Sequence, residues 1–272
     1  MEQITDIKEV QGVLNGLLRH FAEVCERNGL RYYLSNGTLL GAVKYQGFIP
    51  WDDDVDVLMP REDCNKLIQL EEINTAAYRL RATETCATWK IPFAKLSDER
   101  TVCKETTADF GCELGICMDI FPLDNWSGNH KTAVREATWG GLLRRFVSAS
   151  IEETFYSPRR GWRRVILYGN WCFSRLCGVT FFRKRIDRMT QKHAASPTGN
   201  VGCIAWAAYG RREVIPTGEF AETVQVTFEG RQYPAAGGYD AYLRRMYGDY
   251  EQDPPMDRQK THHAFAIYRK DR

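Results

Sequence analysis

The chain lacks long hydrophobic runs and carries little net charge. Its longest mostly apolar stretch, residues 165–182, is interrupted by Asn170, Arg175 and two glycines, which argues against a membrane-spanning helix. A formal net charge of +2 over 272 residues does not favour nucleic acid as a partner. The first nine residues hold four charged side chains and no apolar run, so we expect no signal peptide and a cytoplasmic location.

The chain also lacks a Cys-x-x-Cys pair, internal repeats and low-complexity segments. Its nine cysteines are odd in number and irregularly spaced, which predicts free thiols in a reducing compartment. A zinc site built from Cys103, Cys112, Cys117 and His262 or His263 is a minor alternative, because zinc ligands usually come in closely spaced pairs.

The hydrophobic pattern predicts a mixed fold of the α+β or α/β class. Apolar residues at spacings of three and four predict an amphipathic helix over residues 4–27. The next segments alternate between strands and helices: strand 30–34, helix 38–45, strand 55–59 and a helix opened by Pro60. Further strands are predicted at 78–82, 89–96, 101–105, 115–121 (ended by Pro122), 201–208 and 224–229, and helices over 130–193, broken near 157–158, and 239–247.

Four carboxylates crowd into five positions, at Asp52, Asp53, Asp54 and Asp56, between a tryptophan and an apolar strand. On a strand, Asp54 and Asp56 would point to the same face with their Cα atoms about 6–7 Å apart. Hard divalent cations take oxygen ligands, so the pair predicts a Mg²⁺ site, with Mn²⁺ as the alternative ion. The competing interpretation is a solvated loop with an N-cap aspartate.

Three further features could complete such a site. Asp119 lies in an apolar strand, where a lone acid is costly unless it binds a metal, acts as a base or pairs with a buried cation. Lys95 and Arg100 suit phosphate contacts, although a solvated strand edge explains them equally well. The turn at Gly37-Thr38 offers backbone N–H groups to a phosphate.

The region between Leu143 and Lys192 is strongly basic. It holds twelve Arg or Lys residues against Glu152, Glu153 and Asp187, with aromatic residues between them. This composition suits the anionic inner face of a membrane, and we predict peripheral contact there. A solvated face that balances acids elsewhere is the alternative, and a nucleic-acid surface lacks any accompanying motif.

Three blocks together resemble the LicD/fukutin-related family. The first comprises SNGTLLGAV at residues 35–43 and FIPWDDDVDV at 48–57, and the second is MDIFPLD at 118–124. The third comprises FEG at 228–230, YDAYL at 239–243, YGDY at 247–250 and Pro254-Pro255, with Arg258 and His262 after them. Asn36 departs from the pattern, because relatives often carry an acid before the Gly-Thr pair.

The resemblance implies a nucleotidyltransferase-like fold, a small mixed sheet flanked by helices. We expect a core over 1–128, a basic helical insertion over 129–195, and a mixed C-terminal part over 196–272 that completes the catalytic domain. The implied metal and catalytic residues are Asp54, Asp56 and Asp119. The expected donor or phosphate contacts are Gly37, Thr38, Lys95, Arg258 and His262.

The resemblance further implies a Mg²⁺-dependent transferase that moves phosphocholine from CDP-choline to a hydroxyl of a cell-surface glycan or lipid-linked glycan, such as lipopolysaccharide, teichoic acid or capsule. CMP would leave, so the attack falls on the phosphorus distal to cytidine. Transfer of another CDP-activated alcohol and nucleotidyl transfer from a nucleoside triphosphate are the alternative reactions. A non-catalytic adaptor of polysaccharide assembly is the alternative from a different class.

Overall fold

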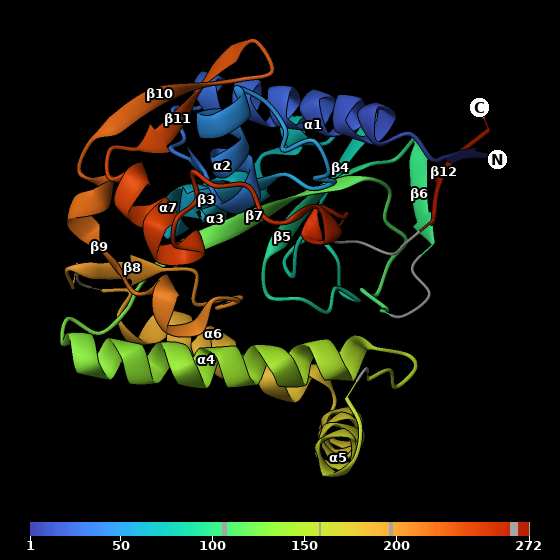
Figure 1. Ribbon diagram of the computed structural model, residues 1–272, viewed down its shortest axis with the longest axis vertical. Coiled ribbons are helices and arrows are strands. Elements are labelled where there is room, and N and C mark those ends of the chain that lie inside the picture. Colours follow the sequence, from blue (N-terminus) through green and yellow to red (C-terminus); the bar gives the residue numbers. More distant parts are fainter. Residues whose placement is uncertain (105–107, 158, 196–197, 262–265, 272) are drawn as a thin grey trace.

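The computed structural model describes residues 1–104, 108–157, 159–195, 198–261 and 266–271. Helices and strands are mixed along the chain (Figure 1), as predicted. The helices are α1 (Ile7–Arg27), α2 (Asn36–Tyr45), α3 (Arg61–Gln69), α4 (His130–Ile151), α5 (Trp162–Cys177), α6 (Val179–Lys192) and α7 (Tyr239–Tyr247), with 3₁₀ turns η1 (Glu71–Ile73), η2 (Gly210–Glu213), η3 (Thr217–Phe220) and η4 (Met256–Arg258). The strands are β1 (Glu2–Ile4), β2 (Tyr33–Leu34), β3 (Asp56–Pro60), β4 (Tyr78–Arg81), β5 (Ala94–Asp98), β6 (Thr101–Lys104), β7 (Cys117–Asn125), β8 (Asn200–Gly202), β9 (Ile215–Pro216), β10 (Thr223–Phe228), β11 (Arg231–Ala236) and β12 (Ala266–Arg269).

The main sheet is mixed, with β3 and β7 as its parallel centre. Within the described residues its order is β2-β3-β7-β5-β4, and β8 and β9 extend it from the end of β7. The β3–β7 pair is parallel, whereas β2, β4, β5, β8 and β9 pair antiparallel. A hairpin of β10 and β11 and a small sheet of β1, β12 and β6 complete the pairing. The small sheet joins the two ends of the chain.

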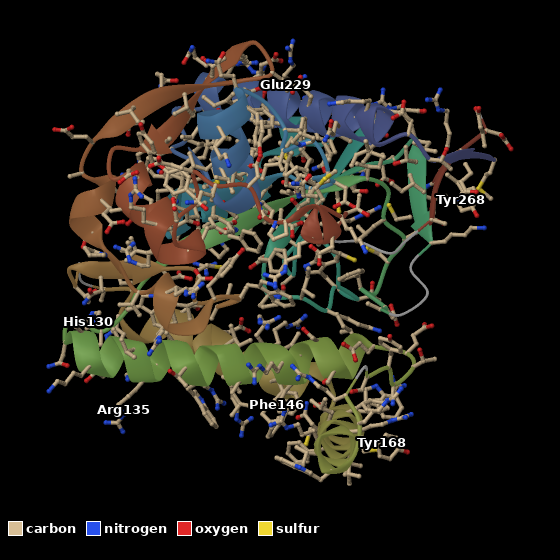
Figure 2. All side chains as sticks on the ribbon, in the orientation of Figure 1. His130, Arg135, Phe146, Tyr168, Glu229 and Tyr268 are labelled. Carbon is tan, nitrogen blue, oxygen red and sulfur yellow. The ribbon has the colours of Figure 1, made fainter. Side chains whose placement is uncertain are left out.

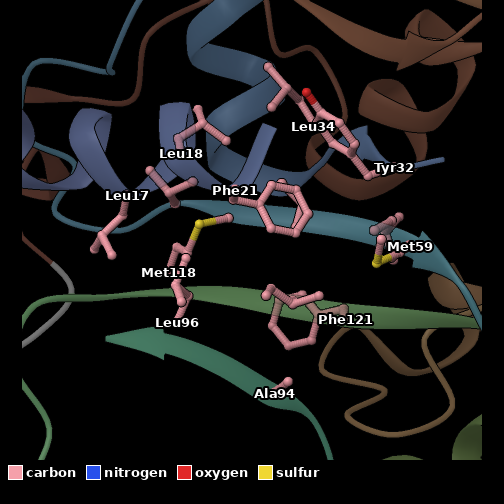
Figure 3. Close-up of a cluster of buried hydrophobic side chains, with 14 of the residues drawn as sticks. Leu17, Leu18, Phe21, Tyr32, Leu34, Met59, Ala94, Leu96, Met118 and Phe121 are labelled. Atoms are coloured by element: carbon pink, nitrogen blue, oxygen red, sulfur yellow. The ribbon is translucent and has the colours of Figure 1, made fainter. Parts of the chain in front are cut away.

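Helix α1 supplies the largest part of the core. Asp6 caps it by accepting a hydrogen bond from the Lys8 backbone N–H at 2.9 Å. The apolar face predicted from the sequence is buried, and Leu17, Leu18 and Phe21 lie over the side chains of the central strands (Figure 3). Because Asp6 caps the helix, α1 begins at Ile7, three residues later than predicted.

Helices α4, α5 and α6 form a separate layer, seen below the sheet in Figure 1. Helix α4 packs on α6 and on η2, and the Phe146 and Phe182 rings stack with centroids 4.9 Å apart. Trp126, four residues before the start of α4, is fully buried. It donates its indole N–H to the Glu213 carbonyl at 2.8 Å. The helices predicted between residues 130 and 193 are present, and the division into segments at residues 128 and 195 stays a prediction.

The predicted end of the seventh strand at Phe121 is wrong, because β7 continues through Pro122 to Asn125. Asp119 donates its backbone N–H to Val55 on the β3 side, so position 122 faces the opposite edge. On that edge β5 pairs with β7 only as far as Ile120, and β8 begins to pair at Asp124. Pro122 falls between these partners, where its missing N–H leaves no ladder bond unmade.

Other strand predictions are partly wrong. The strand expected from Trp89 begins only at Ala94, because the Trp89 indole N–H closes a turn by donating to the Phe93 carbonyl. The strand expected over 201–208 shortens to β8, after which Ala207 donates its N–H to the Cys203 carbonyl in a turn. The strands β1, β9, β11 and β12 were not predicted. The other elements agree to within a few residues.

All nine cysteines are free thiols, as predicted. In the part of the chain that the structure describes, no helix combines the length and the apolar character needed to cross a bilayer.

Gly41 lets α2 approach the loop that carries the acidic run. A Cβ at Gly41 would lie 2.4 Å from the Gly47 carbonyl oxygen and 3.1 Å from the Ile49 nitrogen, whereas a Cβ at Gly12 in α1 would meet nothing within 4 Å. We predict that Gly41→Ala lowers the free energy of unfolding by about 1–3 kcal/mol through overpacking. Gly12→Ala, the matched helical control, should instead raise it by up to about 1 kcal/mol. Urea unfolding of both variants tests this, and equal effects would contradict it.

Candidate active site

Three neighbouring strands bring charged side chains to one level of the sheet. In the register of the main sheet Asp56 of β3 lies opposite Asp119 of β7, and Asp119 lies opposite Lys95 of β5. The Lys95 ammonium is 2.5 Å from the Asp119 carboxylate, and the two side chains are 13% and 19% exposed. Residues from three distant parts of the sequence thus meet in one row, Asp56–Asp119–Lys95.

The start of α2 positions Asp56. The Thr38 hydroxyl accepts the Asp56 backbone N–H at 2.8 Å, and the Asn36 amide donates to the Asp56 carboxylate at 3.0 Å. Tyr242 of α7 in turn donates its hydroxyl to the Asn36 side-chain oxygen at 2.8 Å. The neutral amide at position 36 therefore supplies a donor to Asp56, which an ionised carboxylate at this position would not.

A buried glutamine holds the acidic loop. Gln11 projects from α1 and donates to the carbonyls of Ile49 and Asp52 at 3.2 and 2.9 Å. Gln11 is only 4% exposed, so these bonds fix the loop to the core on its inner side. Asp54 lies in this loop immediately before β3, not within a strand as predicted.

A cavity of about 550 Å³ opens between α2, the acidic loop and the segment after α7. Asp54 and Asp56 lie at its wall beside Gly37 at the start of α2. Aromatic side chains, Arg258, Lys44, Asp249 and Asp253 line much of the remainder. The aromatic residues are Tyr45, Trp51, Tyr209, Tyr247 and Tyr250.

Asp54 and Asp56 are called the acidic group below. A second cavity of about 420 Å³ lies on the other side of this group. Asp54 lines both cavities, whereas Lys95 and Asp119 line only the second. The acidic group thus stands between two separate openings, an arrangement that can receive two reactants from different sides.

Crowding of negative charge perturbs this site. Loss of water, together with Asp54 and Asp119, raises the pKa of Asp56 well above its ordinary range, and the Asn36 hydrogen bond offsets part of that rise. Burial and the charge of Asp54 raise the pKa of Asp52 to about 8. Burial acts to lower the pKa of Lys95, but Asp119, Cys117 and Asp56 outweigh it, so the net shift is upward and Lys95 stays a cation.

The residues present suit a hard divalent cation in chemical type. Asp54 and Asp56 offer carboxylate oxygens, and their mutual repulsion is what a cation would relieve. Within the described residues, however, no group of three or more His, Cys, Asp or Glu side chains is already arranged around a common point. Asp119 is directed to Lys95 instead, so a bound cation would be held chiefly by Asp54 and Asp56.

The predicted site residues fall into three groups. Gly37, Asp54, Asp56 and Arg258 line the first cavity, and Lys95 and Asp119 line the second. Thr38 is buried beneath them with its hydroxyl bonded to Asp56, and Arg100 pairs with Asp98 away from both cavities. His262 and His263 lie outside the described residues.

Sequence reasoning missed Gln11 and the aromatic side chains Tyr209 and Tyr247. Gln11 lies on the apolar face of a long helix, where a lone polar residue reveals no partner. Tyr209 and Tyr247 are brought together by the fold, with their hydroxyl oxygens 3.3 Å apart. Asn36 could have been found from its departure from the family pattern.

Comparison with known proteins identifies the class. Residues 29–149 match the family described as LicD/FKTN/FKRP, nucleotidyltransferase domain. These residues contain Gly37, Asp54, Asp56, Lys95 and Asp119. This segment therefore carries the LicD/FKTN/FKRP domain, and the resemblance predicted from the three sequence blocks is confirmed.

Individual relatives extend this result. The chain is 29% identical to the "Lipopolysaccharide cholinephosphotransferase LicD" of Haemophilus influenzae, across 98% of this chain and 99% of that protein. It is 44% identical to the human "Ribitol 5-phosphate transferase FKRP" over 52 residues, 19% of this chain and 10% of that protein. It is 40% identical to the "Mannosyltransferase regulator 4" of Saccharomyces cerevisiae over 67 residues, 24% of this chain and 6% of that protein.

The Lys95–Asp119 pair gives a prediction for stability. Lys95→Met removes the cation that pairs with the largely buried Asp119 carboxylate. This change should lower the free energy of unfolding by about 3 kcal/mol. Lys90→Met removes a cation from the more exposed Lys90–Asp109 pair, where the side chains are 30% and 45% exposed, and should cost less than about 1 kcal/mol. Equal losses in chemical unfolding would contradict the assignment, and Asp119→Asn should recover stability in the Lys95→Met background.

Glu213 gives a prediction for pH. Burial raises its pKa from an ordinary 4.5 to about 7, and its carboxylate accepts the Tyr209 N–H at 3.3 Å. The folded chain thus binds this proton more tightly than the unfolded chain, so stability falls as pH rises from about 4.5 to about 7. Glu213→Gln keeps an acceptor oxygen and removes the titration. Relative to the parent, the free energy of unfolding of the variant should therefore rise by on the order of 3 kcal/mol between pH 4.5 and pH 8.

Thermal unfolding of the parent and the Glu213→Gln variant at both pH values measures this difference. A constant difference in melting temperature across the range would contradict the assignment.

Proposed function

We propose that this chain transfers phosphocholine from CDP-choline to a hydroxyl of a cell-surface glycan, such as a lipopolysaccharide precursor, and releases CMP. The observation that carries the proposal is the near end-to-end similarity to the H. influenzae protein named as a lipopolysaccharide cholinephosphotransferase. That similarity covers both cavities and the acidic group between them.

The lining of the 550 Å³ cavity supports choline as the transferred alcohol. A trimethylammonium group is bound through the faces of aromatic rings, and Trp51, Tyr209, Tyr247 and Tyr250 line this cavity. Asp249 adds negative charge to the same wall, whereas Asp253 is paired there with Lys44 at 2.6 Å. A neutral polyol such as ribitol would gain less from these side chains.

The phosphate groups of the donor would lie between Asp54, Asp56 and the start of α2. The N-terminal backbone N–H groups of α2 at Gly37 and Thr38 favour a negatively charged oxygen, and Arg258 adds a forked cation on the same cavity. Mg²⁺ held by Asp54 and Asp56 would neutralise charge that develops on the transferring phosphoryl group. The Asp52 carboxylate lies 2.7 Å from where a Cβ of residue 37 would stand, so glycine is what leaves room for it here.

The acceptor would enter through the 420 Å³ cavity, toward Lys95 and Asp119. Asp119 would take the proton of the acceptor hydroxyl, and Lys95 keeps Asp119 in place for that transfer. The acceptor oxygen then forms a bond to the phosphorus distal to cytidine, the bond from that phosphorus to CMP breaks, and CMP leaves. The proton stays on Asp119 until it exchanges with solvent.

The short match to the human ribitol 5-phosphate transferase supports a second candidate, transfer of a different phospho-alcohol by the same groups. Both candidates release CMP, so they differ only in the donor. Product analysis with CDP-choline and CDP-ribitol offered together separates them, and preferential use of CDP-ribitol would replace choline in the proposal.

Asp56→Asn tests the acidic group. The amide keeps the shape of the side chain but removes a charge, so turnover should fall about a thousandfold, because metal-borne charge stabilisation is worth several kcal/mol. The readout is CMP released from CDP-choline in the presence of an acceptor glycan. Asp257→Asn, the same change at an exposed residue, should leave turnover unchanged. Full activity of Asp56→Asn would remove Asp56 from the mechanism.

A further inference from the structure

Helix α5 stands apart from the body of the molecule (Figure 1), and the labelled Tyr168 marks its position in Figure 2. All sixteen of its residues are described, and only Ser174 among them is buried. A helix of this length gains most of its stability by burying an apolar face. The isolated chain leaves that requirement largely unmet.

The exposed side of α5 is strongly apolar. Trp162, Val165, Ile166 and Leu176 follow at steps of three, one and ten residues, which places all four on one side of a helix. They are 68%, 70%, 59% and 87% exposed. We call these four residues the α5 stripe. Large apolar side chains exposed together on one side of a helix mark a contact site.

The orientation of α5 is fixed from its other side. The Trp171 indole N–H and the Arg175 guanidinium both donate to the Glu152 carbonyl, at 3.2 and 2.8 Å. Phe173 lies within the arc of the α5 stripe, and its ring packs edge-on to Phe146 of α4 with centroids 5.8 Å apart, which leaves it 48% exposed. These contacts hold the helix against α4 and leave the α5 stripe facing outward.

The surroundings of the α5 stripe are cationic. From residue 154 to residue 186 the sequence has eight Arg or Lys residues and no Asp or Glu. Four of the arginines lie at the start of α5, and among the described residues no carboxylate is within ion-pair distance of any of them. They are Arg159, Arg160, Arg163 and Arg164.

We propose that α5 docks this chain on an anionic phospholipid bilayer. The α5 stripe enters the boundary between headgroups and acyl chains, and the arginines lie against lipid phosphates. Charge selects this occupant over a second copy, because a two-fold contact through the stripe would bring the same arginines together. The exposed aliphatic side chains select it over nucleic acid, which offers them no apolar layer.

The test is flotation of the whole chain with vesicles of phosphatidylcholine alone or mixed equally with phosphatidylglycerol. Binding should occur only to the mixed vesicles and should weaken as salt is added, roughly fivefold in affinity for each arginine whose attraction to the lipid phosphates is screened. Leu176→Ser should weaken binding about tenfold or more, because a buried leucine contributes that much to transfer from water. Met256→Ser is the matched control, since Met256 is 86% exposed in η4, and its binding should equal that of the parent.

Three results would overturn the proposal. The first is no binding to mixed vesicles, and the second is equal binding by the parent and Leu176→Ser. The third is a stable dimer in light scattering that Leu176→Ser dissociates, because the α5 stripe would then cover a second copy. Both substituted side chains are almost fully exposed, so neither change should disturb folding.

Discussion

The site depends on the pairing of three strands, which places two carboxylates and one ammonium group side by side at the centre of the sheet. Parallel pairing of β3 and β7 sets Asp56 beside Asp119, and antiparallel pairing of β5 sets Lys95 on the far side of Asp119. Lys95 pairs with Asp119, whereas burial and the carboxylates of Asp54 and Asp119 raise the pKa of Asp56. Crowding of carboxylates is costly in a folded chain unless a cation or another ligand offsets it.

The surrounding structure keeps this charge in place. Gln11 holds the acidic loop from the core side, and Gly41 lets α2 lie directly against the same loop. Asn36 and Thr38 then bond the side chain and the backbone of Asp56. The opening on each side of Asp54 follows from this arrangement, because the loop forms a wall between the two cavities. Glu153, close to the start of α5 in sequence, lines the second of them.

Much of the fold could be predicted from the sequence, for identifiable physical reasons. A periodic apolar face predicted α1, and the apolar run after Asp56 predicted β3. The strand through Pro122 could not be predicted, because whether a proline interrupts pairing depends on which edge it faces and where its neighbours end. The strands β1 and β12 could not be predicted either, since their pairing joins residues at opposite ends of the chain.

The acidic residues of the site could be predicted from their own chemistry, but their partners could not. Lys95 was predicted as a phosphate contact, and the structure pairs it with Asp119. Asp54 was expected within a strand, and it lies in the loop before β3. The aromatic lining comes from segments more than 150 residues apart, and only the fold brings Trp51 and Tyr209 to one cavity.

The most direct measurement of the central claim is a calorimetric titration of the purified chain with CDP-choline, with and without Mg²⁺, beside CDP-ribitol and CTP. The predicted result is Mg²⁺-dependent binding of CDP-choline that is tighter than binding of the other two nucleotides. Preferential binding of CTP, or no binding of CDP-choline under either condition, would contradict it.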